Sequence, residues 1–149
     1  MRRAQASGFT LLELLVVISL IAIMMTVVGV GLSRNLESAK SRAVSRDFVA
    51  ALRYTRGMAI LKQKEMSLEV DVGKKSYLVP GKKEVQLPEG VDIKLLTAEE
   101  ELVGEQRGRI RFYPDGASTG GRVTIVVDER EWKVNVGWLT GEVALEEVK

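Results

Sequence analysis

Glu13 is the residue of this chain whose type and surroundings point most directly to chemistry. Between Phe9 and Leu32 it is the only ionisable side chain, and most of the residues around it are apolar. A carboxylate inside a membrane costs several kcal/mol unless it is paired. We therefore predict a functional role for Glu13. The alternative is a charge that extends to the lipid–water interface.

The apolar run around Glu13 is long enough to cross a membrane. At about 1.5 Å of rise per residue, residues 9–32 would form a helix of roughly 35 Å, which exceeds the hydrocarbon core of a bilayer. We predict a transmembrane helix, with a buried helix of a soluble domain as the alternative. Arg2 and Arg3 precede the run, so the positive-inside rule places the N-terminus in the cytoplasm and the remainder outside.

Small residues, Ala6, Ser7 and Gly8, come directly before the apolar run. They would give a peptidase access to the backbone, but an ordinary secretory signal has its small-residue site after the apolar region. A cut at this point would remove only the basic leader, residues 1–8. The apolar segment would stay attached to the rest of the chain.

The hexapeptide from Gly8 to Glu13, GFTLLE, resembles the type III signal of type IV pilins and pseudopilins. The resemblance implies that prepilin peptidase cleaves between Gly8 and Phe9 and that the new amine of Phe9 is N-methylated. It also implies that Glu13 promotes filament assembly by pairing with the N-terminal amine of a neighbouring subunit. An ammonium partner would neutralise the otherwise unpaired carboxylate.

Composition argues against an enzyme. The 149 residues include no histidine and no cysteine, which excludes the common Ser-His and Cys-His nucleophile systems and most transition-metal sites. Ser118 and Thr119 therefore have no histidine base, and the acidic stretch Glu99–Glu101 lacks the spacing and the glycine of an EF-hand. We predict no catalytic, cofactor-binding or metal-binding residue. The formal net charge of +2 equals the contribution of Arg2 and Arg3, so no overall basic excess indicates nucleic acid.

Residues 33–64 are predicted to continue the helix as an amphipathic segment. Apolar and small side chains recur near helical spacing, and most basic side chains lie on other faces. We expect the apolar face to pack under a sheet and the basic face to be solvated, with binding to anionic headgroups or DNA as the alternative. The predicted packing positions are Leu36, Ala39, Ala43, Phe48, Ala51, Leu52, Thr55, Met58 and Ala59.

Residues 65–149 show the alternating pattern of β-strands and form the predicted globular domain. The acidic stretch 97–108 is expected to be a mobile, solvated loop. Trp132 has the parity of the apolar residues that follow it and is placed in the core, whereas Trp138 is expected to be exposed and to contact a partner. The predicted strands are 66–72, 76–79, 82–86, 91–95, 109–113, 122–127, 132–136 and 143–145.

The segment from Ile110 to Gly121, followed by Trp132 and by Leu139-Thr140-Gly141, resembles the C-terminal signature of the GspH/FimT family of minor pseudopilins. The end of the predicted helix, Phe48–Arg56, also matches that family. The expected fold class is α+β, with a long N-terminal helix packed on antiparallel β-sheets in a pilin-like fold.

This resemblance implies a non-enzymatic minor pseudopilin of the type II secretion system. It would lie at or near the tip of a periplasmic pseudopilus that helps to export proteins across the outer membrane. Its partners would be other major and minor pseudopilins, prepilin peptidase and inner-membrane lipid, and its C-terminal domain would be periplasmic.

The alternative is a FimT-like minor pilin of a type IV pilus, with a role in pilus assembly or DNA uptake. DNA binding would require an exposed basic surface, because phosphate contacts dominate the affinity. The candidates for such a surface are Arg107, Arg109, Arg111 and Arg122, which we expect to line one side of the sheet.

Overall fold

The computed structural model describes residues 10–104, 106–127 and 130–148, without the side chains of residues 26–38. The predicted leader, residues 1–8, and Phe9 therefore lie outside the described residues. A single α-helix, α1, spans Leu11–Lys62. The chain divides into two compact units, Met1–Ser38 and Ala39–Lys149, and all the strands belong to the second unit.

Local hydrogen bonds define both ends of α1. At the start, the Glu13 amide donates to the Thr10 carbonyl at 3.1 Å and lies 3.2 Å from its hydroxyl oxygen, so Thr10 caps the helix. At the end, Gln63 has a φ of 51° and the Lys64 amide donates to the Ala59 carbonyl at 3.2 Å. This left-handed cap ends α1 at Lys62, two residues before the predicted end.

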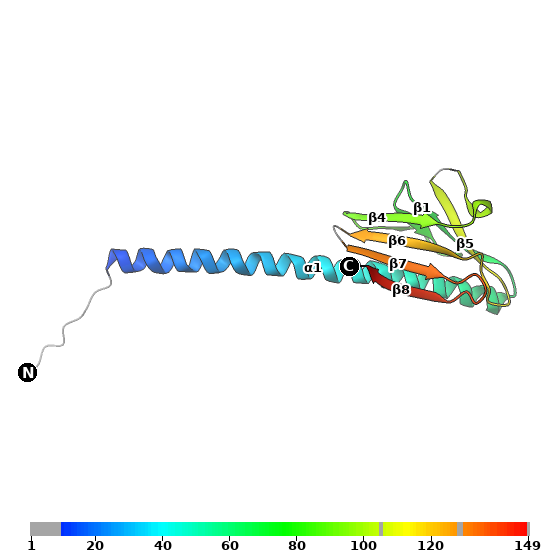
Figure 1. The fold of residues 1–149 in the computed structure, drawn as a ribbon, viewed down its shortest axis with the longest axis horizontal. Helices are drawn as coiled ribbons and strands as arrows, with labels where there is room; N and C mark the ends of the chain where they lie inside the picture. Colours follow the sequence, from blue (N-terminus) through cyan, green and yellow to red (C-terminus); the bar gives the residue numbers. More distant parts are fainter. Residues whose placement is uncertain (1–9, 105, 128–129, 149) are drawn as a thin grey trace, which may run out of the picture. The chain divides into compact units, whose positions relative to one another are not determined.

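The second unit contains two four-stranded antiparallel sheets (Figure 1). Sheet A has the strand order β3-β2-β1-β5 and sheet B has the order β4-β6-β7-β8. The strands of sheet A are β1 (Met66–Asp71), β2 (Ser76–Leu78), β3 (Val85–Gln86) and β5 (Arg107–Phe112). Those of sheet B are β4 (Val91–Leu96), β6 (Gly121–Val127), β7 (Arg130–Val136) and β8 (Val143–Val148).

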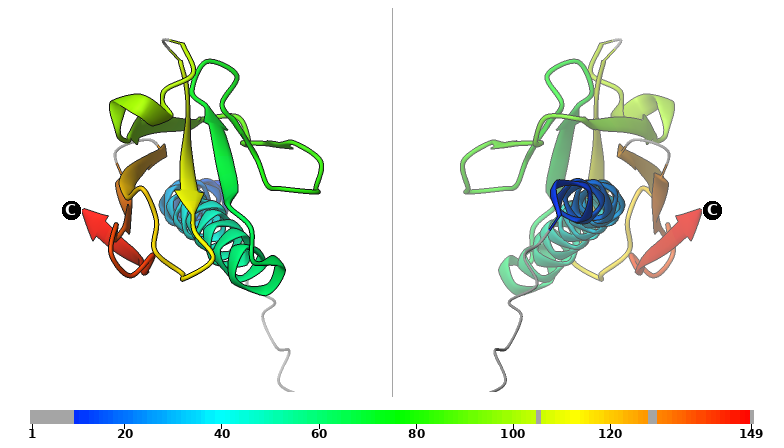
Figure 2. Two further views of the ribbon diagram at one scale, coloured as in Figure 1. Left: turned by 90° about the vertical axis from the view of Figure 1, so that its right-hand side faces the viewer. Right: turned by 90° about the vertical axis from the view of Figure 1, so that its left-hand side faces the viewer.

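The core lies where the inner faces of both sheets meet the part of α1 that belongs to the second unit (Figure 2). Phe48 and Leu52 of α1 are fully buried there, together with Ile110 and Phe112 of β5. The Phe48 ring meets the Tyr77 ring edge-to-face, with 5.1 Å between centroids. Trp132 is 6% exposed, which confirms its predicted place in the core.

The predicted buried face of α1 is confirmed at Phe48, Leu52, Thr55 and Ala59, but it differs nearer the start of the second unit. Ala39 and Ala43 are exposed, so their predicted packing role is wrong, and Ser41 and Ser45 are buried instead. The Ser45 hydroxyl donates to the Ser41 carbonyl at 2.9 Å, which satisfies this polar group within the helix. Ser41 and Ser45 continue the helical stripe of Phe48 and the later buried residues, although their polarity concealed it. Leu36, another predicted position, has its side chain outside the described residues.

Most described residues of the stretch 97–108 are exposed, as predicted, but the stretch is not a loop throughout. It contains a 3₁₀ helix, η1 (Glu99–Glu101), and its last two residues already belong to β5. Glu99 and Glu100 are exposed, but Glu101 is only 4% exposed. A run of acids therefore presents two members to solvent and one to the protein.

Candidate functional site

Glu13 lies in the first turn of α1, where its charge complements the positive end of the helix dipole. The large apolar side chains from Leu11 to Met25 surround it along the helix and are between 45% and 83% exposed. An apolar surface of this extent indicates contact with another apolar phase or another chain.

Within the described residues, no helix is both long enough and apolar enough to cross a membrane. The side chains of residues 26–32, the last part of the predicted span, lie outside the described residues.

The four arginines predicted to form a basic surface do not lie together. Arg107, Arg109 and Arg111 alternate along the outer face of β5 in sheet A, whereas Arg122 belongs to β6 in sheet B. The prediction of one basic stripe is therefore wrong. The strand pattern alone could not show that β5 and β6 belong to different sheets.

A buried carboxylate neutralises two of these arginines. Glu101 pairs with Arg109 through the Nε atom, and its second oxygen lies 3.0 Å from Nε of Arg111. Arg111 also donates to Glu65 at 2.9 Å. The hydrogen bonds that Arg111 donates to Glu65 and, secondarily, to Glu101 raise the pKa of Arg111 above its usual range. Sequence spacing gave no signal for Glu101, since its partners lie on a strand that only the fold brings beside η1.

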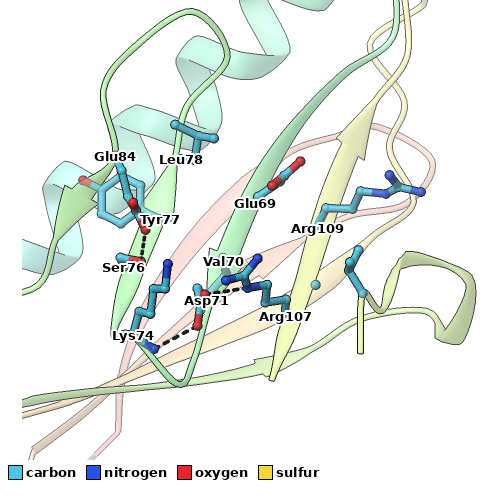
Figure 3. A pocket seen from close by; sticks show the side chains of 12 residues that line it. Glu69, Val70, Asp71, Lys74, Ser76, Tyr77, Leu78, Glu84, Arg107 and Arg109 are labelled. Atoms are coloured by element: carbon cyan, nitrogen blue, oxygen red, sulfur yellow. Dashed lines mark hydrogen bonds and ion pairs between the residues drawn. The ribbon is translucent and has the colours of Figure 1, made fainter. Parts of the chain in front are cut away.

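Arg107 is neutralised as well, at the edge of a pocket of about 320 Å³ between β1, β2 and β5 (Figure 3). Its Nε atom lies 2.6 Å from Oδ2 of Asp71, and the Lys74 amide donates to the other carboxylate oxygen at 2.8 Å. The amide of Lys74 and the guanidinium of Arg107 keep the pKa of Asp71 below its usual range. Glu69 and Glu84 also line the pocket, so it presents both charges and not a cationic surface.

We next consider the acidic groups and the hydroxyl groups that could take part in metal binding or catalysis. The described residues include no group of three or more acidic side chains placed to hold a metal ion. Ser118, one of the two hydroxyls considered from the sequence, donates to the Gly137 carbonyl at 3.0 Å and accepts from the Gly120 amide at 2.9 Å. Its geometry is that of a turn residue.

Arg56 of α1 joins the two turns that carry the C-terminal signature. Its Nε atom donates to the Gly116 carbonyl at 3.0 Å, and its terminal nitrogen donates to the Thr140 carbonyl at 2.9 Å. The prediction that the basic side chains of this helix are solvated is therefore wrong for Arg56, which is half-buried. The signature residues are close in space because one guanidinium holds both turns against the helix.

These turns present apolar side chains to solvent. The Ser118 amide donates to the Trp138 carbonyl at 2.9 Å, which fixes the backbone after β7 to the segment before β6. Trp138 and Leu139 are 69% and 67% exposed. The exposure predicted for Trp138 is confirmed, and its role as a partner contact stays a prediction.

The family follows from sequence comparison. Residues 44–140 match the family model described as Type II transport protein GspH, and residues 3–29 match the model described as the prokaryotic N-terminal methylation motif. The chain is also 34% identical over 141 residues to the type II secretion system protein H of Xanthomonas campestris pv. campestris, covering 95% of this chain and 83% of the relative. The chain belongs to the GspH family of type II transport proteins.

Solved structures show the same fold. The minor pseudopilin EpsH of the Vibrio cholerae type 2 secretion system superposes with a TM-score of 0.57 at 15% identity, covering 72% of this chain and 97% of EpsH. The type IV minor pilin FimU of Pseudomonas aeruginosa superposes with a TM-score of 0.55 at 14% identity, covering 74% and 90%. The predicted α+β, pilin-like fold is confirmed.

Proposed function

We propose that this protein is a minor pseudopilin of a type II secretion system, a non-enzymatic subunit at or near the tip of a periplasmic pseudopilus. The observation that carries the proposal is the presence of a GspH domain and an N-terminal methylation motif in one chain. In this role the protein would help to drive protein export across the outer membrane.

The N-terminal segment would supply the anchor. Prepilin peptidase would cleave between Gly8 and Phe9, and the new Phe9 amine would be N-methylated. Residues 9–32 would cross the inner membrane once, with the N-terminus cytoplasmic and the C-terminal domain periplasmic. The exposed apolar side chains from Leu11 to Met25 support this arrangement, because lipid or neighbouring anchors would cover them.

Glu13 would then act in assembly. Glu13 lies close in sequence to the Phe9 amine that cleavage would create. In the filament, however, the Phe9 amine of each subunit would pair with Glu13 of a neighbouring subunit. Pairing between Glu13 of one pseudopilin and the Phe9 ammonium of the next would neutralise both charges within the apolar phase. The partners in this step are the other major and minor pseudopilins of the filament.

The alternative, a minor pilin involved in pilus assembly or DNA uptake, has less support. The fold is shared with a type IV minor pilin, but three of the four arginines considered for DNA are paired with carboxylates. Phosphate binding at those positions would have to break existing ion pairs.

Secretion in a strain that lacks the gene tests the proposal. We expect a secreted hydrolase to accumulate in the periplasm, and the intact gene to restore its release into the medium. A Glu13→Ala form should be processed but should not restore release, whereas a matched Glu69→Ala form, altered at an exposed acid of the domain, should restore it. Unchanged secretion together with loss of piliation or DNA uptake would contradict the proposal.

A further inference from the structure

The basic side chains on the outer face of sheet B have different partners from the arginines of β5 in sheet A. Arg122 donates from Nε to Oδ1 of Asn135 at 2.6 Å, so a neutral amide orients its guanidinium. Among the described residues, no carboxylate forms an ion pair with Arg122, Lys94 or Lys133. Lys94 and Lys133 lie on either side of Thr124 in the cross-strand register. Lys133 lies opposite Glu146 in the register of β7 and β8, so Arg122 is the cation of this face that is best placed to bind another molecule.

A shallow groove of about 400 Å³ begins beside Arg122. Leu96 and Ala98 form one side, and Val136 lies on the other. Gly121 contributes to its lining, where an added Cβ would lie only 3.0 Å from the Leu96 carbonyl oxygen. Arg122 is the one charged side chain among the described residues that line this groove. We call it the Leu96–Arg122 groove.

Exposed apolar side chains border the Leu96–Arg122 groove. Leu96 is 66% exposed, and Trp138 is 69% exposed. Trp138 lies next to the groove, because a Cβ added at the groove residue Gly120 would come within 3.1 Å of the Trp138 Cβ. Tryptophan and arginine are among the residue types enriched in energetically important protein contacts.

We infer that the Leu96–Arg122 groove binds an acidic residue, flanked by an apolar side chain, on a neighbouring pseudopilin subunit. The inference rests on the proposed function and adds the chemistry of one contact. The carboxylate would pair with the guanidinium of Arg122, which can bind two oxygens at once. The apolar side chain would pack on Leu96 and Trp138. Asn135 would reduce the cost of binding by orienting Arg122 beforehand.

A protein partner fits this face better than DNA does. Glu131 and Glu146 lie on the same outer face of sheet B. Glu131 belongs to β7, as Lys133 does, and Glu146 lies opposite Lys133 in β8. Their charges would repel a duplex, whose phosphates would spread over this face, more strongly than a single acid confined to the groove. DNA would also leave the exposed surfaces of Leu96 and Trp138 in contact with water.

Site-specific photo-crosslinking in the full-length membrane protein tests the inference. A photoreactive amino acid is placed at Leu96, at Leu78 as an exposed control on sheet A, or at Val17 in the apolar segment. Each form is co-expressed with the epitope-tagged major and minor pseudopilins of the same secretion machine, which serve as the probes. We expect Leu96 to crosslink to one tagged subunit and Leu78 not to do so.

Charge variants identify the contact. Arg122→Glu should reduce the Leu96 crosslink about tenfold, and Arg122→Lys should reduce it less because the charge remains. Replacing one acid of the crosslinked subunit by arginine should restore the Arg122→Glu yield. An unchanged yield in Arg122→Glu, a product formed by two copies of this chain, or a salt-sensitive shift of a DNA duplex that depends on Arg122 would overturn the inference.

The Val17 form distinguishes failure of the groove from failure of the proposed function. Crosslinks from Val17 to a tagged pseudopilin, without any from Leu96, would leave the proposed function intact and refute the groove. Absence of crosslinks from both positions would refute both the groove and the proposed function. Crosslinks from both, with the charge dependence described above, would support the contact.

Discussion

At the residue scale, Glu101 is the one charged side chain that is buried among the described residues. Glu101→Gln would keep its size but would leave Arg109 and Arg111 without their shared charge. We expect the free energy of unfolding to fall by about 2 kcal/mol, less than for a fully buried pair, because the arginines are 33% and 28% exposed. Urea denaturation measures this change. Glu100→Gln, at an exposed neighbour, should change it by less than about 0.5 kcal/mol, and equal losses would contradict the role of Glu101.

Tyr77 makes stability depend on alkaline pH. Its burial, and secondarily the negative charge of Asp47, raise the pKa of Tyr77 above the usual value of 10.0. The folded state therefore holds the phenol proton more tightly than the unfolded chain does. This contribution to stability is fully present below about pH 10 and is lost as the pH rises through the raised pKa.

Tyr77→Phe should remove this part of the alkaline decline. Unfolding free energies measured from about pH 8 to 11 should fall less steeply for the variant than for the parent chain. Tyr113→Phe retains Tyr77 and should keep the parent slope. Identical slopes for Tyr77→Phe and the parent would show that other groups cause the whole decline.

At the element scale, two glycines predict opposite effects of the same substitution. Gly141 has a φ of +61°, and a Cβ there would overlap the Gly116 carbonyl oxygen and lie 2.9 Å from Nε of Arg56. Gly141→Ala should lower the free energy of unfolding by about 2–3 kcal/mol, because it forces apart the two turns that Arg56 holds. Gly57 is exposed within α1 and has no neighbour within 4 Å of an added Cβ. Gly57→Ala should raise the free energy by about 0.5–1 kcal/mol.

Thermal and urea unfolding of both alanine variants against the parent chain measure this contrast. A loss of stability in both would mean that helix propensity does not limit α1 at Gly57. A gain of stability in both would mean that the two turns bound by Arg56 can accommodate a methyl group at position 141.

The strands could be predicted from the sequence more reliably than the buried face of the helix. Alternation correctly predicted most strands, since an apolar residue at every second position fixes the buried face, as in β7 with Trp132. The buried face of the helix was harder to predict from the sequence. Ser41 and Ser45 are polar residues, but their small hydroxyl side chains pack in the interior as closely as alanine does. Residues such as Ala39 carry little directional signal, so helical spacing alone could not choose between these faces.

The candidate site was predictable only where its chemistry is local in sequence. The signal around Glu13 is contiguous and falls within the matched N-terminal methylation motif, residues 3–29, while the role of Glu13 in assembly stays a prediction. Glu101 and Arg56 act through partners that are distant along the chain, and which charges meet depends on sheet order. The basic stripe failed for the same reason, since Arg122 has the right type and parity but lies in the other sheet.

At the scale of the whole molecule, stability and assembly are predicted to reside in different units. Among the side chains that the structure describes, every residue of the buried core falls within the second unit, between Phe48 and Val143. The large apolar side chains from Leu11 to Met25 are exposed and contribute nothing to that core. Removal of the first unit would therefore leave all the described core contacts in place.

A chain lacking residues 1–38 should consequently fold without detergent and should remain monomeric in aqueous buffer. Its second unit should keep the backbone amide spectrum of the full chain, and Glu101→Gln should destabilise both forms equally, because none of the described core contacts is lost. The truncated chain, exported by an unrelated signal, should nevertheless fail to restore secretion in the deletion strain, since it lacks Glu13 and the apolar segment. Restored secretion would show that the second unit alone carries the function, whereas an unfolded fragment would show that the core depends on residues 1–38.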